Sequence, residues 1–247
     1  MRGVAGIPEP RLLGLRVEPT PPGLVPIPPT LLAVRQIPNC DPSLAAALGL
    51  DPDRHRSLGL LTCDADDALY VALDHCTKAA EVDVVFGHSF YAGAAHASGP
   101  LSGEVLGVVA GEHPDHVEEA LWALREGLRE VAFCRFEGTD GPAFLAHSIG
   151  ELGRYLSVEA GLPEGSAMAY LIAPPLESMV GIDAALKAAD VRLAKHIPPP
   201  SETNFGGAFL AGELAEVEAA TVAFVEAIRE VVRSPLGGLR RPMRLRR

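Results

Sequence analysis

The segment Lys78-Ala79-Ala80-Glu81-Val82 occurs a second time in the chain, almost unchanged, as Lys187-Ala188-Ala189-Asp190-Val191. Around this pair, residues 57–84 align with residues 166–193 without a gap. A later match has a different offset, so one loop of the first copy contains extra residues. Two large similar units are too few for a solenoid or a propeller. The repeat therefore predicts two tandem domains of one fold, with function in the loops that diverge between them.

Apolar residues alternate between helical and strand-like spacing in both copies. In the first copy they recur at helical spacing from Leu69 to Ala80 and from Val117 to Val131, and the second copy repeats both patterns. Strand-like runs surround these helices at 57–61, 82–86, 104–109, 131–136, 167–172, 191–196 and 207–211. Strands that alternate with helices in units of about 100 residues predict an α/β fold, an α+β sandwich with helices on one face of each sheet.

Turn and breaker residues divide the chain into four segments. Residues 1–30 are rich in proline and are expected to be an extended arm without helix or sheet. The first domain is expected over 31–138 and the second over 139–235, because residues 137–142 are turn-forming throughout. Residues 236–247 contain five arginines and are expected to be a flexible, solvated tail.

Composition excludes several classes of protein. The net charge of −11 argues against nucleic acid as a partner, because neutralising phosphates requires a basic face. No apolar run approaches the roughly 20 residues of a membrane helix, and no signal-peptide core follows Arg2. We interpret the cysteines as reduced thiols of a cytoplasmic protein, and their spacing indicates no metal site. They are Cys40, Cys63, Cys76 and Cys134.

The acidic run Asp64-Ala65-Asp66-Asp67 leaves two other functions open. An Asp-x-Asp after an apolar strand can be the nucleophile and acid of a Mg²⁺-dependent phosphatase, but the doubly wound domain and downstream motifs of that class are not apparent. Taken alone, the run is more simply an acidic turn or helix start. The other alternative is a soluble trimeric regulator that binds a small molecule and does not assemble into sheets.

The duplicated Lys-Ala-Ala-acid-Val segment resembles the BMC domain of bacterial microcompartment shell proteins. Over residues 31–235 the chain is similar to the EutL-type tandem-domain shell proteins of ethanolamine-utilisation microcompartments. The motifs that carry this resemblance include Arg56-Ser57-Leu58-Gly59-Leu60, Tyr91-Ala92-Gly93-Ala94-Ala95-His96, Ala143-Phe144-Leu145-Ala146-His147 and Pro198-Pro199-Pro200-Ser201-Glu202-Thr203-Asn204.

The resemblance implies two circularly permuted, ferredoxin-like BMC domains in a non-enzymatic protein without cofactors. It further implies a homotrimer with the outline of a hexamer, which tiles a hexagonal sheet with neighbouring shell proteins in the cytoplasm. Lys78 and Lys187 match the family's tile-edge lysine. The two loops of a gated central pore correspond to His88, Ser89, Tyr91, Gly93 and His96 in the first copy and to Pro198, Pro199, Pro200, Ser201, Glu202, Thr203 and Asn204 in the second.

The resemblance also implies a site for ethanolamine. The family's ligand positions map to Asp66 and Glu104, with Phe133 contributing its backbone carbonyl, and Asp67 is adjacent. A primary ammonium has three donors and no acceptor, so two carboxylates and one carbonyl form a matched set of acceptors.

Overall fold

The computed structural model describes residues 23–90, 104–201 and 204–238. The first half of the chain builds a four-stranded antiparallel sheet in the order β2-β3-β5-β4. Its strands are β2 (Leu31–Ile37), β3 (Ser57–Cys63), β4 (Asp83–Phe90) and β5 (Glu104–Gly111), and its helices are α1 (Pro42–Ala47), α2 (Asp66–Ala79) and α3 (Pro114–Gly127).

The second half repeats this arrangement as an antiparallel sheet in the order β7-β8-β10-β9. Its strands are β7 (Leu145–Ile149), β8 (Met168–Ala173), β9 (Arg192–Ile197) and β10 (Gly206–Ala211), and its helices are α4 (Arg154–Ala160), α5 (Pro175–Ala188) and α6 (Leu214–Arg233). A two-stranded ribbon of β1 (Leu24–Ile27) and β6 (Phe133–Phe136) joins the halves. The predicted α/β fold is confirmed. The expectation that helices cover only one face of each sheet is wrong, because α1 packs on the face of the first sheet opposite α2.

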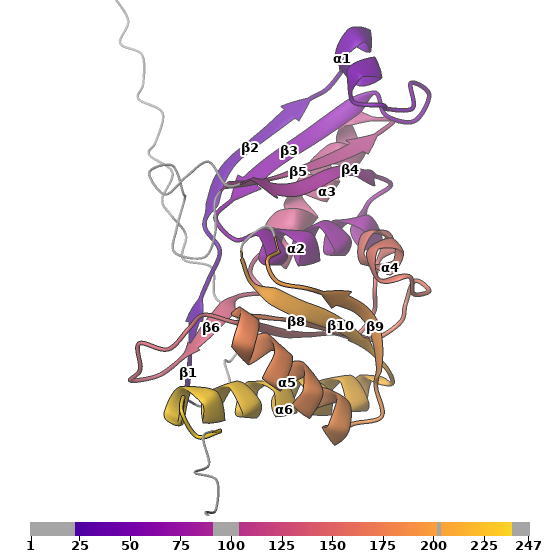
Figure 1. Cartoon of the computed structure of the whole chain (residues 1–247). Coiled ribbons are helices and arrows are strands. Elements are labelled where there is room, and N and C mark those ends of the chain that lie inside the picture. Colours follow the sequence, from indigo (N-terminus) through magenta and orange to yellow (C-terminus); the bar gives the residue numbers. More distant parts are fainter. Residues whose placement is uncertain (1–22, 91–103, 202–203, 239–247) are drawn as a thin grey trace, which may run out of the picture.

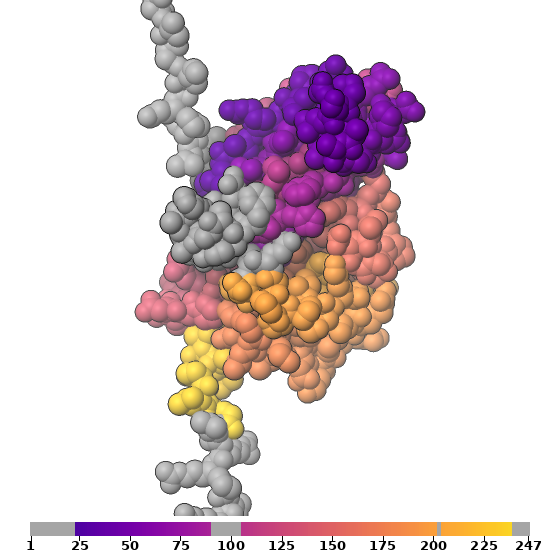
Figure 2. Space-filling model, turned by 45° about the horizontal axis from the view of Figure 1, so that its top comes forward, coloured from indigo at the N-terminus to yellow at the C-terminus, as the bar shows by residue number. Residues whose placement is uncertain are grey.

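Sheets and helices alternate through the molecule (Figure 1). One continuous core contains Leu61 of the first sheet, Leu69 of α2 and Tyr170 of the second sheet, so α2 lies between the two sheets. A second core lies between the second sheet and the helices α5 and α6, and a small third core lies under α1 on the outer face of the first sheet. The space-filling view shows the indigo and purple first domain resting directly on the salmon and orange second domain (Figure 2).

The structure corrects the gapless alignment of the two copies. Leu58 pairs with Ala110, whereas Met168 pairs with Ala211, the repeat counterpart of Ala110. Met168, rather than Ala167, is therefore the counterpart of Leu58. The helices still match without a shift, because the turn between strand and helix is one residue longer in the first copy.

The repeat also extends further than the sequence comparison found. Residues 37–50, which contain α1, match residues 149–162, which contain α4. A glycine in the left-handed region follows each helix, Gly49 with φ 67° and Gly161 with φ 63°. Few side chains are shared over these short helices, so this glycine was the signal that could have revealed them.

One expectation about the chain ends was wrong. The proline-rich segment was expected to contain no sheet, yet β1 lies inside it and Pro26 pairs with Cys134. Proline is tolerated here because β1 is an edge strand of a two-stranded ribbon. The missing N–H of Pro26 therefore does not interrupt the hydrogen bonds of a central strand. Residues 1–22 and 239–247 lie outside the described residues. Within the part of the chain that the structure describes, no helix is both long and apolar enough to cross a bilayer.

Candidate functional site

Asp66 and Asp67 are the first two residues of α2, and both are buried, with 4% and 6% of their surface exposed. Ala65 precedes them and provides no side-chain cap. The carboxylates instead lie where the helix leaves its N–H groups free and carries partial positive charge. The Asp67 N–H donates to Oδ1 of Asp66 at 2.8 Å. Local helix chemistry thus explains why two acids can be buried here.

A residue of the second domain completes this acidic pair. The Tyr170 hydroxyl, on β8, donates to Oδ1 of Asp67 at 2.5 Å. Its ring packs edge-on against Phe209, with centroids 4.6 Å apart. Burial, followed by the nearby charge of Asp67, raises the pKa of Tyr170 well above its usual range. The phenol therefore remains a proton donor to the carboxylate at all physiological pH values.

The acidic pair opens on a cavity of about 220 Å³ between the two domains. Lys195 reaches this cavity from β9, pairs with Glu159 at 2.8 Å, and holds its ammonium 5.6 Å from the centre of the Phe209 ring. The other lining residues include Tyr70, Gly87, His88, Tyr155 and Ser201. Buried carboxylates beside aromatic faces form an environment that favours an organic cation over an anion.

Glu104 and Phe133 come from elements that meet near the start of α2. Glu104 begins β5, and the next residue, Val105, pairs with Cys63 at the end of β3, three positions before Asp66. Phe133 begins β6, is 2% exposed, and belongs to the same core as Cys63 and Val105. The backbone therefore brings Asp66 and Glu104 to one end of the first sheet, and Phe133 belongs to the core that packs against it. The side chain of Glu104 is outside what the structure describes.

The predicted first pore loop begins later than expected because β4 continues into it. His88 and Ser89 belong to β4 rather than to a loop, and the Ser89 N–H donates to the Tyr70 hydroxyl at 3.0 Å. Of the predicted first-loop residues, Tyr91, Gly93 and His96 lie outside the described residues. Each loop nevertheless joins equivalent strands, β4 to β5 in the first copy and β9 to β10 in the second.

The second loop makes a tight turn next to β10. The Ser201 N–H donates to the Phe205 carbonyl at 3.0 Å, and the Asn204 N–H donates to the Ser201 carbonyl at 3.1 Å. Asn204 has φ 65°, a left-handed conformation that asparagine tolerates better than most residues. Pro198, Pro199 and Pro200 lead into this turn, and the predicted residues Glu202 and Thr203 lie outside the described residues.

The two predicted edge lysines differ in their surroundings. Lys78 donates to the backbone carbonyl of Glu151 in the second domain at 3.0 Å. Lys187 instead forms an i,i+4 ion pair with Asp183 at 2.6 Å, and its side chain is 73% exposed. Lys78 thus bonds to a backbone carbonyl of the second domain, whereas Lys187 pairs with a residue of its own helix.

Sequence reasoning missed the polar contacts that hold the two domains together. Asp74 of α2, 1% exposed, accepts the N–H of Gly153 at 2.7 Å and the N–H of Leu156 at 2.8 Å. Thr77 accepts the N–H of Arg154 at 3.0 Å. These side chains cap α4, whose own N-cap residue is glycine and has no side chain. Side chains of α2 in the first domain therefore accept hydrogen bonds from the free N–H groups at the start of α4 in the second domain.

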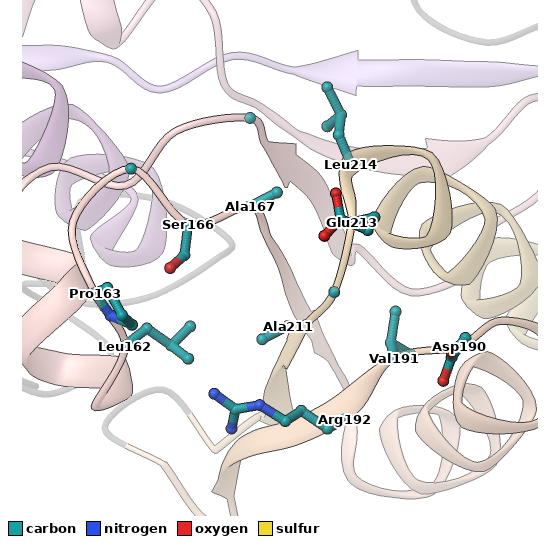
Figure 3. A pocket seen from close by; sticks show the side chains of 13 residues that line it. Leu162, Pro163, Ser166, Ala167, Asp190, Val191, Arg192, Ala211, Glu213 and Leu214 are labelled. Carbon is teal, nitrogen blue, oxygen red and sulfur yellow. The ribbon is translucent and has the colours of Figure 1, made fainter.

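A larger cavity lies elsewhere, at one end of the second sheet. It has a volume of about 650 Å³. Figure 3 shows Glu213 and Val191 on one side of an open centre and Ser166 and Leu162 on the other. A smaller cavity of about 380 Å³ occupies the equivalent place in the first copy, where the Arg154 guanidinium donates to the Val82 carbonyl at 2.8 Å. The charged residues of the larger cavity are exposed, so it offers weaker ligand chemistry than the acidic pair.

The described residues give no support to the phosphatase alternative. Every strand pairing that they form is antiparallel, whereas that class needs a doubly wound parallel sheet. Nor does any group of three or more His, Cys, Asp or Glu within the described ranges have a geometry suited to a metal ion.

Comparisons with known proteins agree with this geometry, although no protein-family model matches the chain. The bacterial microcompartment shell protein EutL of Clostridium perfringens is 48% identical over 210 residues, which cover 85% of this chain and 96% of that protein. EutL of Escherichia coli is 47% identical over 216 residues, covering 87% and 98%. A crystal structure of C. perfringens EutL matches with a TM-score of 0.81 over 87% of this chain and 97% of that one, at 47% identity.

A trimeric shell protein, PduB, shares the fold with a TM-score of 0.68 at only 19% identity, over 83% of this chain and 89% of that one. The resemblance seen in the sequence is therefore confirmed. Relatives that are more than 45% identical align with this chain over almost their whole length. The chain therefore belongs to the EutL family of bacterial microcompartment shell proteins and is built from two tandem BMC domains.

Proposed function

We propose that the chain forms a homotrimeric tile, with the outline of a hexamer, in the shell of an ethanolamine-utilisation microcompartment in the cytoplasm. The observation that carries this proposal is the presence of two complete, equivalent domains in a chain of this family. Three such chains present six similar edges, which suits a site in a hexagonal sheet, while the two copies remain free to diverge. The tile has a structural role and no catalytic one.

The same proposal assigns the loops after β4 and β9 to a central pore that passes small metabolites. They join equivalent strand pairs in the two copies, so a trimer would carry three loops of each kind around its axis. Their sequences combine glycine, which permits rearrangement, with a run of three prolines, which stiffens a segment. A loop with stiff and loose parts can move between two arrangements, as a gate requires.

The ligand of the proposed tile is ethanolamine, bound as the protonated amine by Asp66, Glu104 and the carbonyl of Phe133. The burial of Asp66 and its neighbour Asp67 supports this assignment, because a carboxylate shielded from water binds an ammonium more strongly. Each charge-assisted hydrogen bond would contribute about 1.5–3 kcal/mol. A ligand that prefers the closed arrangement of the pore would shift the population toward it.

Calorimetry with ethanolamine tests this site. We expect Asp66→Asn and Glu104→Gln each to weaken binding by about tenfold or more, since each removes a charge and keeps the shape. The double variant should not bind measurably. Binding should also weaken at low pH, where the carboxylates become protonated, and at high pH, where the amine loses its proton. Asp183→Asn, an exposed acid of the second copy, is the matched control and should bind normally.

No heat of binding in the parent chain, or unchanged binding in the double variant, would remove ethanolamine from the proposal. It would leave the proposed tile itself untouched, because assembly is measured independently.

Tiling is tested by replacing both predicted edge lysines. Lys78→Ala with Lys187→Ala removes two exposed cations and leaves the core intact, so the trimer should persist while flat arrays become fewer and smaller in electron micrographs. Arrays as extensive as those of the parent chain would contradict the edge role. If the parent chain binds the ligand and forms trimers that never assemble into arrays, the soluble regulator would be favoured.

A further inference from the structure

The cavity of about 380 Å³ in the first copy and the cavity of about 650 Å³ in the second copy are built on the same backbone frame. Each lies where the chain leaves a long helix, α2 or α5, and enters the edge strand that follows, β4 or β9. Six lining positions are equivalent in the two cavities, residues 81–83 and 110–112 in the first copy and residues 190–192 and 211–213 in the second. The two cavities can therefore be compared position by position.

An arginine of the second domain enters the cavity of the first copy. The Arg154 guanidinium donates to the Val82 carbonyl at 2.8 Å and to the Ala80 carbonyl at 3.4 Å. Both carbonyls lie just beyond the end of α2, where a helix carries partial negative charge and favours a cation. Arg54 brings a second guanidinium to this cavity and pairs with Asp83 at 2.7 Å. The first copy thus shows that this frame binds guanidinium groups.

The cavity of the second copy keeps the acceptors of the first. Asp190 stands at the position of Glu81. Glu213 stands at the position of Glu112, and it lies beside the open centre of the cavity (Figure 3). The carbonyl of Val191 again lies just beyond the end of a long helix. The second cavity therefore offers two carboxylates and a helix-end carbonyl to a donor.

The two arginines of the first cavity have no counterparts in the second. The counterpart of Arg154 is Pro42, because residues 37–50 match residues 149–162. The loop that contains Arg54, residues 51–56, is replaced by residues 163–166, which are two fewer and include no basic residue. Within the described ranges, no side chain donates to the Val191 carbonyl. The larger volume of the second cavity agrees with the loss of both arginine side chains.

We propose that the cavity of the second copy binds a guanidinium group, in the place that Arg154 occupies in the first copy. A guanidinium has five N–H donors in one plane, so it can bond a carbonyl and a carboxylate at the same time. The site is separate from the proposed ethanolamine site, because no residue lines both cavities. The guanidinium belongs either to a small molecule or to an arginine side chain, and binding experiments separate these two sources.

Arg192 makes the second cavity less favourable for a cation than the first. It stands at the position of Asp83, and its side chain is exposed. A like charge at this position repels the incoming guanidinium, although water screens the repulsion. The acids of the cavity are exposed as well, and exposed ion pairs contribute little. A free guanidinium compound should therefore bind weakly, with a Kd of about 1 mM.

Calorimetry with ethylguanidinium tests the site in the full chain, which should bind one molecule per chain. Asp190→Asn with Glu213→Gln should weaken binding about tenfold, because it removes two exposed ion pairs and keeps the shape. Arg192→Asp restores the residue type of the first copy and should strengthen binding about tenfold. Tetramethylammonium carries the same charge without an N–H donor and should not bind measurably.

Arg154→Ala empties the equivalent place in the first copy. This variant should bind two molecules of ethylguanidinium per chain, one in each copy. Arg129→Ala is the matched control, because it removes an arginine that pairs with Glu126 on α3, and it should bind one molecule. Circular dichroism verifies that both variants remain folded. The variants of the second cavity test the site independently of this result, since their substituted side chains are exposed.

A peptide of residues 236–247, which contains five arginines, separates the two sources of the guanidinium. Peptide binding that is tenfold tighter than that of ethylguanidinium, and is weakened in Asp190→Asn with Glu213→Gln, would support an arginine side chain as the occupant. Equal affinities would support a small guanidinium compound. No binding of ethylguanidinium to the parent chain, or unchanged binding in the double variant, would overturn this inference. Neither result would affect the proposed ethanolamine site or the proposed tile.

Discussion

Asp74→Ala should lower the free energy of unfolding by about 3–6 kcal/mol, because it removes two hydrogen bonds to a buried charged group, each contributing about 1.5–3 kcal/mol. The variant leaves the N–H groups of Gly153 and Leu156 without this acceptor at the start of α4. Urea denaturation at a fixed protein concentration measures the loss. The denaturation slope should stay constant if the folded state remains equally compact.

Asp183→Ala provides the matched control for this prediction. The same residue type occupies the same place in the repeat, but its side chain is 63% exposed and, within the described part of the chain, bonds to Lys187 alone. An exposed i,i+4 pair stabilises a helix by about 0.3–0.5 kcal/mol, so the control should change stability by no more than that. Similar losses in the two variants would show that Asp74 does not hold the domains together.

The stability of the parent chain should fall by about 2–3 kcal/mol as the pH decreases from about 6.5 to about 4, through His147 alone. Burial, followed by the charge of Lys78, lowers the pKa of this histidine from 6.5 to about 4. In that range the unfolded chain binds a proton that the folded chain does not, so acid favours unfolding. His147 keeps part of its surface exposed, so screening by water makes the effect smaller than the full shift implies.

The contribution of His147 is isolated by comparing the parent chain with His147→Gln across this pH range. Carboxylates titrate in both proteins, so the difference between their unfolding free energies reports the histidine. That difference should be constant above pH 7 and should shift in favour of the variant below about pH 6.5. Parallel curves for the parent chain and His147→Gln would show that His147 titrates normally.

The fold could be predicted from the sequence where its determinants are local. The repeated Lys-Ala-Ala-acid-Val segment and the apolar spacing around it identified both pairs of long helices and the strands beside them, because each pattern spans a few consecutive residues. The short elements α1 and α4 were missed. Helices of six and seven residues contain too few turns to produce a periodic signal.

The candidate site was predictable only in part. The sequence alone predicted an acidic turn or helix start at Asp66 and Asp67, and only the resemblance to the family assigned a ligand to Asp66. Their partner Tyr170 was missed because it lies 103 residues away and on another domain. Asp74 and Asp183 occupy equivalent positions of the repeat, yet Asp74 is buried and Asp183 is exposed. The sequence could not distinguish the two. Burial at a contact between domains depends on the assembled geometry, and no local pattern reports it.

The cap that Asp74 provides to α4 has a consequence for the history of this chain. A tile made from six identical small proteins can be encoded by one short gene, and a duplicated chain could in principle return to that state by gene fission. Here the N-cap residue of α4 is glycine, and Gly153 leaves room for the first half where a side chain would collide. A second half expressed alone would begin α4 with unsatisfied N–H groups and expose the face that covers α2. The two halves are therefore no longer interchangeable, because the start of α4 in the second half is satisfied by side chains of the first half.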